Sequence, residues 1–179
     1  RWGGWMWPGD PLTTWRTLQT HIAIGINHSL SVSPFWNSDI GAFYTTPEYS
    51  AELYVRWVQF AAFNSLMRTH GRGWENRLPW AWGQGKPGTG EGSYAPPASE
   101  LNNPTIEPIA KKYIELRYQL LSYNYTLTWE ARETGMPMMR SLWLHYPKDK
   151  QARGIGDAYL WGRDMLIAPV YEKGATSRE

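Results

Sequence analysis

The feature that most constrains the fold is an alternation of strand-like and helix-like segments between residues 1 and 70 of this 179-residue chain. Residues 1–10, 30–36 and 65–69 have the length and apolar content of strands. Helical periodicity falls between them, over residues 11–25 and 46–64. Helices that connect consecutive strands imply a parallel sheet. The pattern therefore predicts an α/β fold, either doubly wound or a (β/α)8 barrel.

Each of the two predicted helices has one apolar face. The first has its apolar residues at steps of three and four, namely Trp15, Leu18, Ile22 and Ile26. The second is expected to begin at Thr46-Pro47-Glu48, which combines a cap, a proline and an acidic residue. It is expected to bury Leu53, Trp57, Phe60 and Ala61. These faces would cover the sheet.

The pattern changes after residue 70. Residues 71–104 are rich in Gly, Pro, Ser and Asn and show neither period, so we expect a long loop there. Residues 106–133 predict one long helix that ends at Gly135 and Pro137, and residues 138–146 and 159–171 are strand candidates. We therefore expect one domain over residues 1–136 and the start of a β-domain over 137–179.

Composition excludes several kinds of partner and site. The net charge of +2 is small and the basic residues do not cluster, which argues against a nucleic-acid partner. No apolar run approaches the roughly 18 residues that span a membrane. The chain has no cysteine, and its four histidines lack metal-ligand spacing. We therefore expect neither a metal nor a cofactor.

Two aspartates stand beside aromatic rings at strand ends. Asp10 follows Trp7, and Asp39 lies between Trp36 and Phe43. Flat apolar rings stack on the C–H face of a sugar, and an apolar wall raises a carboxyl pKa, which suits a general acid. This setting predicts a carbohydrate site.

Each candidate residue also has a structural interpretation. Asp10 fits the cap of a helix that begins at Pro11, and Asp39 fits an ordinary turn before a glycine. A lone histidine such as His70 is often structural. For Trp7, Trp36 and Phe43 the alternative is packing in the core.

Several segments resemble glycoside hydrolase family 31, which comprises retaining α-glucosidases and α-xylosidases. Trp7-Pro8-Gly9-Asp10 resembles its W-x-G-D segment, Ser38-Asp39-Ile40-Gly41-Ala42-Phe43 its D-[IV]-x-G-F segment, and Met67-Arg68-Thr69-His70 its R-x-H segment. Val55-Arg56-Trp57 and Leu116-Arg117-Tyr118 resemble two of its helices, and Pro137-Met138-Met139-Arg140 resembles a segment that leaves its barrel. The resemblance covers nearly the whole chain. Ala42 departs from it, because a second glycine is usual there.

The resemblance implies the second half of a catalytic (β/α)8 barrel followed by the start of a β-sandwich domain. It implies that Asp10 is the general acid/base and that Asp39, Arg68 and His70 bind the sugar. It places the nucleophilic aspartate before residue 1. We therefore expect the chain to be a piece of a longer protein and to be inactive alone.

The resemblance implies hydrolysis, with retention, of terminal α-glucosyl or α-xylosyl residues. An inactive carbohydrate-binding relative and a transglycosylase are the alternatives. Loss of the nucleophile would leave an inactive binding protein. An acceptor sugar that outcompetes water would make the enzyme a transglycosylase.

Overall fold

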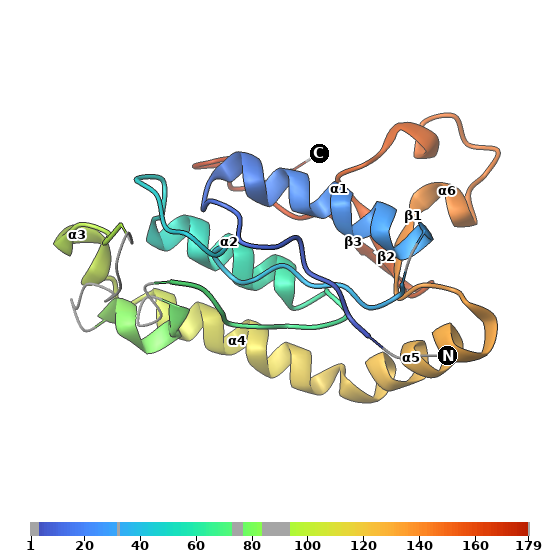
Figure 1. Ribbon diagram of the computed structural model, residues 1–179, viewed down its shortest axis with the longest axis horizontal. Coiled ribbons are helices and arrows are strands. Elements are labelled where there is room, and N and C mark those ends of the chain that lie inside the picture. Colours follow the sequence, from blue (N-terminus) through green and yellow to red (C-terminus); the bar gives the residue numbers. More distant parts are fainter. Residues whose placement is uncertain (1–3, 32, 73–76, 84–93, 179) are drawn as a thin grey trace.

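The computed structural model describes residues 4–31, 33–72, 77–83 and 94–178 (Figure 1). Among them it assigns the helices α1 (Trp15–Ser31), α2 (Ala51–Ala61), α3 (Ala98–Leu101), α4 (Ile106–Gln119), α5 (Leu121–Thr134) and α6 (Leu142–His145), the 3-10 turns η2 (Pro79–Gly83) and η3 (Ala152–Gly154), and the strands β1 (Met139–Ser141), β2 (Tyr159–Trp161) and β3 (Met165–Ile167). None of the helices in these ranges is long and apolar enough to cross a membrane.

Three extended segments hold the first part of the molecule together, the first around Met6, the second from Trp36 to Asp39 and the third around Arg68, and they run parallel in chain order. The first and second segments pair at Met6 and Trp36, and the second and third pair at Asp39 and Arg68. The Asn37 amide donates to the Met6 carbonyl at 3.1 Å, and the Ile40 amide donates to the Arg68 carbonyl at 3.1 Å. These are isolated bridges rather than long ladders. They confirm the predicted parallel alternation.

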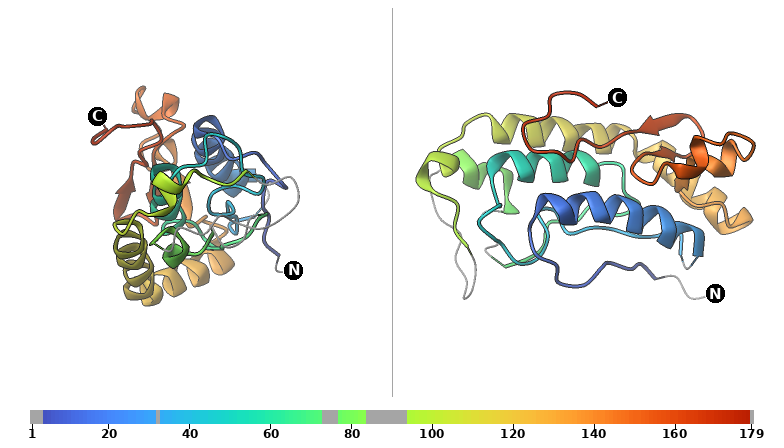
Figure 2. Two further views of the ribbon diagram at one scale, coloured as in Figure 1. Left: turned by 90° about the vertical axis from the view of Figure 1, so that its left-hand side faces the viewer. Right: turned by 90° about the horizontal axis from the view of Figure 1, so that it is seen from above.

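Helices α1 and α2 pack on one face of these segments, and α4 lies beside α2 (Figure 2). Of their predicted inward residues, Leu18 and Ile22 from α1 and Trp57 and Phe60 from α2 are buried in the same core. Trp15 is only partly buried and packs against this core. The amphipathic pattern therefore predicted the buried face correctly.

The bounds of α1 differ from the prediction of 11–25. The helix begins at Trp15 and continues to Ser31, so Leu30 is helical and the following strand begins only near Phe35. Thr14 acts as its cap, because its Oγ1 accepts a hydrogen bond from the Thr17 amide at 3.0 Å. Pro34 disfavours helical geometry at Ser33, the residue before it, so α1 ends before that position.

The predicted start of the second helix at Thr46 is also wrong. Helix α2 begins at Ala51 with Ser50 as its cap, and the Ser50 hydroxyl accepts from the Leu53 amide at 3.3 Å. Glu48 instead serves α1, because its Oε2 accepts from the Trp15 amide at 2.9 Å. Glu48, which the sequence placed at the start of the second helix, thus caps α1 instead.

The predicted long helix over 106–133 is divided in two. Leu120 leaves helical geometry between α4 and α5, with φ −82° and ψ 5°. The predicted end is correct, since Gly135 adopts φ 78° as the left-handed cap of α5. The expected loop over 71–104 contains η2 and α3 in its described part.

The last segment forms an antiparallel sheet in the order β1-β2-β3. Met139 pairs with Trp161, and Trp161 pairs with Met165. Gly162 turns this hairpin at φ 65°. The strands are shorter than the predicted ranges 138–146 and 159–171, because α6 follows β1 directly and a turn separates β2 from β3.

Candidate active site

The three parallel segments place alternate residues on one shared face. Side chains alternate between the two faces of an extended chain, so residues two apart point the same way. Trp5 and Trp7 come from the first segment, Asp39 from the second, and Arg68 and His70 from the third. Five side chains from three segments that are distant in sequence are thereby brought together. We call them the Asp39 cluster.

The centre of the cluster is an ion pair between Asp39 and Arg68. Arg68 Nε donates to Asp39 Oδ1 at 2.6 Å, and Arg68 Nη2 lies 2.6 Å from the same oxygen. Asn37 Nδ2 also donates to Oδ1, at 3.4 Å. Asp39 Oδ2 is buried and has no hydrogen-bond partner among the described residues. One carboxylate oxygen therefore remains as a free acceptor.

Burial controls the ionisation of Asp39. The residue is only 1% exposed, and this desolvation raises the pKa of its carboxyl above the ordinary value. The guanidinium of Arg68 and the nearby His70 favour the carboxylate and limit the rise. Burial and the nearby cations thus act on the pKa of Asp39 in opposite directions, and burial has the larger effect.

Two tryptophan rings cover the Arg68 guanidinium. Its carbon lies 4.7 Å from the Trp5 ring centroid and 5.4 Å from that of Trp7. The two rings are 5.8 Å apart, and Trp7 is 42% exposed. A cation over an indole face is attracted by the ring quadrupole. Arg68 is therefore fixed by the rings on one side and by Asp39 on the other.

Phe43 and His70 form a second ring contact at the ends of two segments. Their centroids are 5.4 Å apart, and His70 is exposed. Phe43 also meets Tyr44 edge-on at 4.8 Å. An apolar ring and an imidazole thus stand together next to the ion pair.

Asp10 follows the first segment and has an exposed side chain. Helix α1 begins at Trp15, so the structure contradicts the alternative that Asp10 caps a helix starting at Pro11. The Pro11 carbonyl accepts from the Phe43 and Tyr44 amides, both at 3.0 Å. Asp10 is therefore held next to the strand end that carries Phe43.

Trp36 does not belong to the cluster. It is 2% exposed, and its ring meets His21 at 6.0 Å and Phe60 at 6.3 Å. Gly25 of α1 makes room for it, since a Cβ there would lie 3.0 Å from the Trp36 ring. These surroundings match the core-packing alternative rather than a sugar-binding wall.

Ser38 ties the second segment to both helices behind it. Trp57 Nε1 donates to Ser38 Oγ at 2.7 Å, and Ser38 Oγ lies 2.7 Å from His21 Nδ1. Because an indole nitrogen only donates, the Ser38 proton is available for Nδ1 of a neutral His21. Burial lowers the His21 pKa to about 4, which keeps the imidazole neutral.

The turn after Asp39 has an unusual backbone. The Ala42 amide donates to the Asp39 carbonyl at 2.8 Å, which closes a turn. Gly41 adopts φ 79° and Ala42 φ 56°, both in the left-handed region. Asp39 is thus a turn residue in its backbone, as one alternative proposed, while its side chain pairs with Arg68.

Three residues in or next to the cluster were not predicted. Trp5 and Asn37 could have been found, because each lies two residues before a predicted site residue. Arg77 had no such signal, since it lies in the segment 71–104 that lacks any period. Trp74, in the loop expected over residues 71–104, lies outside the described residues.

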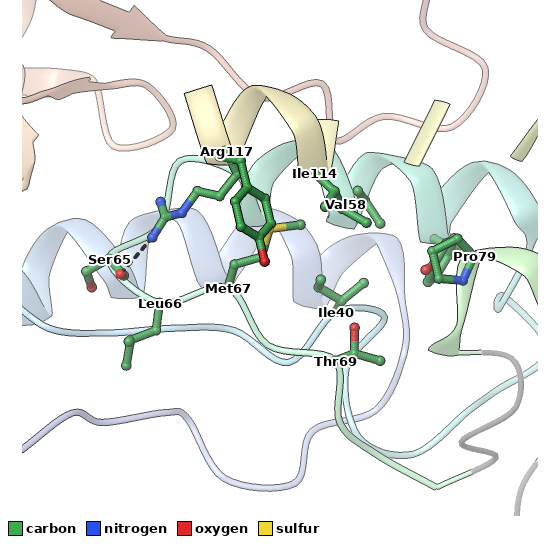
Figure 3. Close-up of a pocket in the computed structure, with 11 residues that line it drawn as sticks. Ile40, Val58, Ser65, Leu66, Met67, Thr69, Pro79, Ile114 and Arg117 are labelled. Atoms are coloured by element: carbon green, nitrogen blue, oxygen red, sulfur yellow. Dashed lines mark hydrogen bonds between the residues drawn. The ribbon is translucent and has the colours of Figure 1, made fainter. Parts of the chain in front are cut away.

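A separate cleft of about 380 Å³ lies on the opposite face of the third segment (Figure 3). Met67 and Thr69, which alternate with the cluster residues, line it together with Ile114 and Arg117 of α4. None of the described residues that line it carries a carboxylate. Its described lining therefore lacks the pair of carboxyl groups that a retaining glycosidase uses. In the described ranges, no group of three or more His, Asp or Glu side chains could hold a metal ion.

Comparison with curated proteins gives relatives with related activities. The chain is 36% identical over 174 residues to an α-glucosidase of Bacillus thermoamyloliquefaciens, covering 97% of this chain and 19% of that protein. It is 32% identical over 167 residues to an α-xylosidase of Saccharolobus solfataricus, covering 92% and 20%. It is 34% identical over 178 residues to an isomaltosyltransferase of Sporosarcina globispora, covering 96% and 15%. The chain thus spans a fifth or less of the length of these relatives.

A solved structure and two family models agree with these relatives. A family 31 dextranase of Flavobacterium johnsoniae, complexed with glucose, superposes with a TM-score of 0.79 and 33% identity over 96% of this chain and 20% of the dextranase chain. The family 31 TIM-barrel domain matches residues 1–127, and the family 31 C-terminal domain matches residues 135–179. The parallel segments and their helices are therefore part of a (β/α)8 barrel, and the chain belongs to glycosyl hydrolase family 31.

Proposed function

We propose that the full-length polypeptide containing residues 1–179 is a retaining glycosidase that acts on non-reducing terminal α-glucosyl or α-xylosyl residues. The observation that carries this proposal is the Asp39 cluster. It offers a buried carboxylate with one unpaired oxygen, a fixed guanidinium and exposed aromatic faces. A hydroxylated ring with an apolar face matches each of these groups.

The residues have distinct roles in this proposal. Asp39 accepts a sugar hydroxyl through Oδ2, while Arg68 and His70 bind neighbouring hydroxyls. Trp7 and Phe43 form the apolar wall. Trp36 acts from the core by supporting the second segment, consistent with its burial.

Asp10 is the proposed general acid/base. Its exposed carboxyl at a barrel-strand end can reach a leaving-group oxygen and later a water molecule. Retention needs a second carboxyl about 5–5.5 Å away as nucleophile. By the resemblance, an aspartate outside residues 1–179 supplies it, so the chain alone is expected to be inactive.

The substrate class rests on the site and on the relatives. Their printed names include α-glucosidase and α-xylosidase, and the dextranase structure contains glucose. Both sugars present the same ring hydroxyls to the Asp39 cluster. We therefore propose a carbohydrate substrate in the α-glucosyl or α-xylosyl class.

We also propose a domain boundary between residues 136 and 137. Gly135 ends α5, Pro137 follows, and the antiparallel sheet begins at Met139. The change from parallel to antiparallel pairing at this point supports separate units.

The test is hydrolysis of an aryl α-glucoside and an aryl α-xyloside by the full-length polypeptide and its Asp10→Asn variant. Removing a general acid/base should lower kcat/KM roughly 10²–10⁴-fold. Asp164→Asn, at an exposed hairpin position, is the matched control and should keep parental turnover. Folded parent that hydrolyses neither substrate would contradict the proposal.

A transglycosylase is the second candidate, favoured by the similarity to an isomaltosyltransferase. It would use the same site with a sugar acceptor in place of water. Product analysis with maltose separates the two, because only transfer yields oligosaccharides longer than the substrate. Sugar binding without either product would indicate an inactive binding relative.

A further inference from the structure

Arg77 is a buried arginine that binds main-chain carbonyls. It is 1% exposed. Its Nη1 donates to the Ile40 carbonyl at 3.0 Å, its Nη2 to the Phe43 carbonyl at 2.9 Å, and its Nε to the Arg72 carbonyl at 3.2 Å. None of the ion pairs in the described ranges involves Arg77.

These three carbonyls belong to two different loops. Ile40 and Phe43 lie in the turn that follows Asp39, and Arg72 lies in the loop that follows His70. One planar guanidinium therefore connects the end of the second segment with the end of the third. A rigid fork of donors suits this task better than a flexible ammonium.

The surrounding residues are arranged to admit the guanidinium. A Cβ at Gly41 would lie 2.5 Å from Arg77 Nη1, and a Cβ at Gly71 would lie 2.9 Å from Arg77 Nη2. The guanidinium carbon lies 5.0 Å from the Tyr49 ring centroid. The Tyr54 hydroxyl donates to the main-chain carbonyl of Arg77 at 3.0 Å. The two glycines thus leave room for the Arg77 guanidinium, the Tyr49 ring packs against it, and Tyr54 of α2 holds the main chain of Arg77.

The two loops that Arg77 connects carry two residues of the proposed site. Phe43 and His70 lie on them with centroids 5.4 Å apart, and Asp39 begins the turn that Arg77 holds. We propose that Arg77 is a positioning residue for the sugar-binding site. It sets the separation of Phe43 and His70 and fixes the turn after Asp39. This inference rests on the proposed function of that site.

The test compares Arg77→Met and Arg77→Lys with Arg117→Lys in the full-length polypeptide. Arg117 is the matched control, because it also donates to three carbonyls, those of Ala62, Asn64 and Ser65, but lies on the opposite face of the third segment. We measure kcat and KM for an aryl α-glucoside and an aryl α-xyloside, well below the melting temperature of every variant. Calorimetric binding of a piperidine iminosugar gives a second readout.

Misplacement of binding groups by about 1 Å costs up to roughly 100-fold. Arg77→Met should therefore lower kcat/KM and iminosugar affinity roughly 10- to 100-fold, with KM rising more than kcat falls. Arg77→Lys should recover part of the loss. Arg117→Lys should lower the melting temperature but leave KM and affinity within about twofold, since it contacts neither loop.

The outcomes separate this inference from the proposed function. Active parent whose Arg77→Met variant loses only thermal stability, with unchanged KM and affinity, overturns the positioning role alone. A folded parent that binds the iminosugar without turnover overturns the proposed glycosidase activity. The iminosugar affinity of the Arg77 variants relative to the parent then decides the role of Arg77. Parent that neither turns over nor binds overturns both.

Discussion

The guanidinium of Arg68 links the Asp39 carboxylate to the indole ring of Trp5. It lies 2.6 Å from Asp39 Oδ1 and 4.7 Å from the Trp5 ring centroid. Neither residue of the ion pair is near the other in sequence, and both belong to neighbouring parallel segments. This relationship makes the charge state of Asp39 depend on Arg68.

Arg68→Met should destabilise the full-length polypeptide by about 1–3 kcal/mol at pH 7, because it leaves a buried carboxylate without its cation. Arg68 is 28% exposed, which keeps the loss below that of a fully buried pair. Burial already raises the pKa of Asp39, and losing Arg68 raises it further. A protonated Asp39 no longer needs the cation. The deficit should therefore shrink as pH falls through that pKa.

The measurement is urea unfolding of parent and variant at several pH values. The double variant Arg68→Met/Asp39→Asn is the control, because it removes the charge together with its partner and should recover much of the stability. A deficit that is the same at all pH values in the single variant would contradict this account.

Trp7 and Trp36 should respond differently to replacement by alanine. Trp36 is 2% exposed in the core, so Trp36→Ala should cost about 3–5 kcal/mol of unfolding free energy. Trp7 is 42% exposed, so Trp7→Ala should cost far less stability but weaken sugar binding. Thermal melting and iminosugar titration check the two effects. Equal loss of stability in both variants would contradict the assignment of Trp7 to the site.

His21 should make the protein sensitive to acid. Its folded pKa of about 4 lies below the ordinary value of 6.5, so the unfolded state binds the proton first as pH falls. The contribution of neutral His21 is complete above about pH 6.5 and is lost progressively towards pH 4, with a total of about 3 kcal/mol. His21→Gln cannot take up this proton. The advantage of the parent over His21→Gln should therefore shrink as pH falls from 7 to 4, which urea titrations can measure. Parallel stability curves for the two proteins would show that His21 does not carry the effect.

Ala42 should tolerate glycine better than another buried alanine. Its φ of 56° costs a residue with a Cβ about 1–2 kcal/mol relative to glycine. Ala62 is equally buried but has φ −59°. Ala62→Gly should therefore destabilise the protein by about 1–2 kcal/mol more than Ala42→Gly. Equal changes in unfolding free energy would show that the turn after Asp39 has relaxed in solution.

The sequence predicted the order of elements because that order depends on local periodicity. The faces of α1 and α2 follow from steps of three and four between apolar residues, and Gly135 marks the end of α5 as expected. Family motifs located the segments that carry Asp39, Arg68 and His70. Element boundaries failed where a distant group took over a local signal, as when Glu48 capped α1 instead of its own helix.

The sequence by itself therefore determined the parallel alternation, the buried helix faces and the identity of the charged groups that meet at Asp39. Only the tertiary structure decided that Trp36 packs in the core while Trp5 covers Arg68. It also decided that Arg77 connects two loops. The reason is physical, because amphipathic periodicity is a property of consecutive residues. A guanidinium bound to three main-chain carbonyls has acceptors of any residue type, so it leaves no pattern in the sequence.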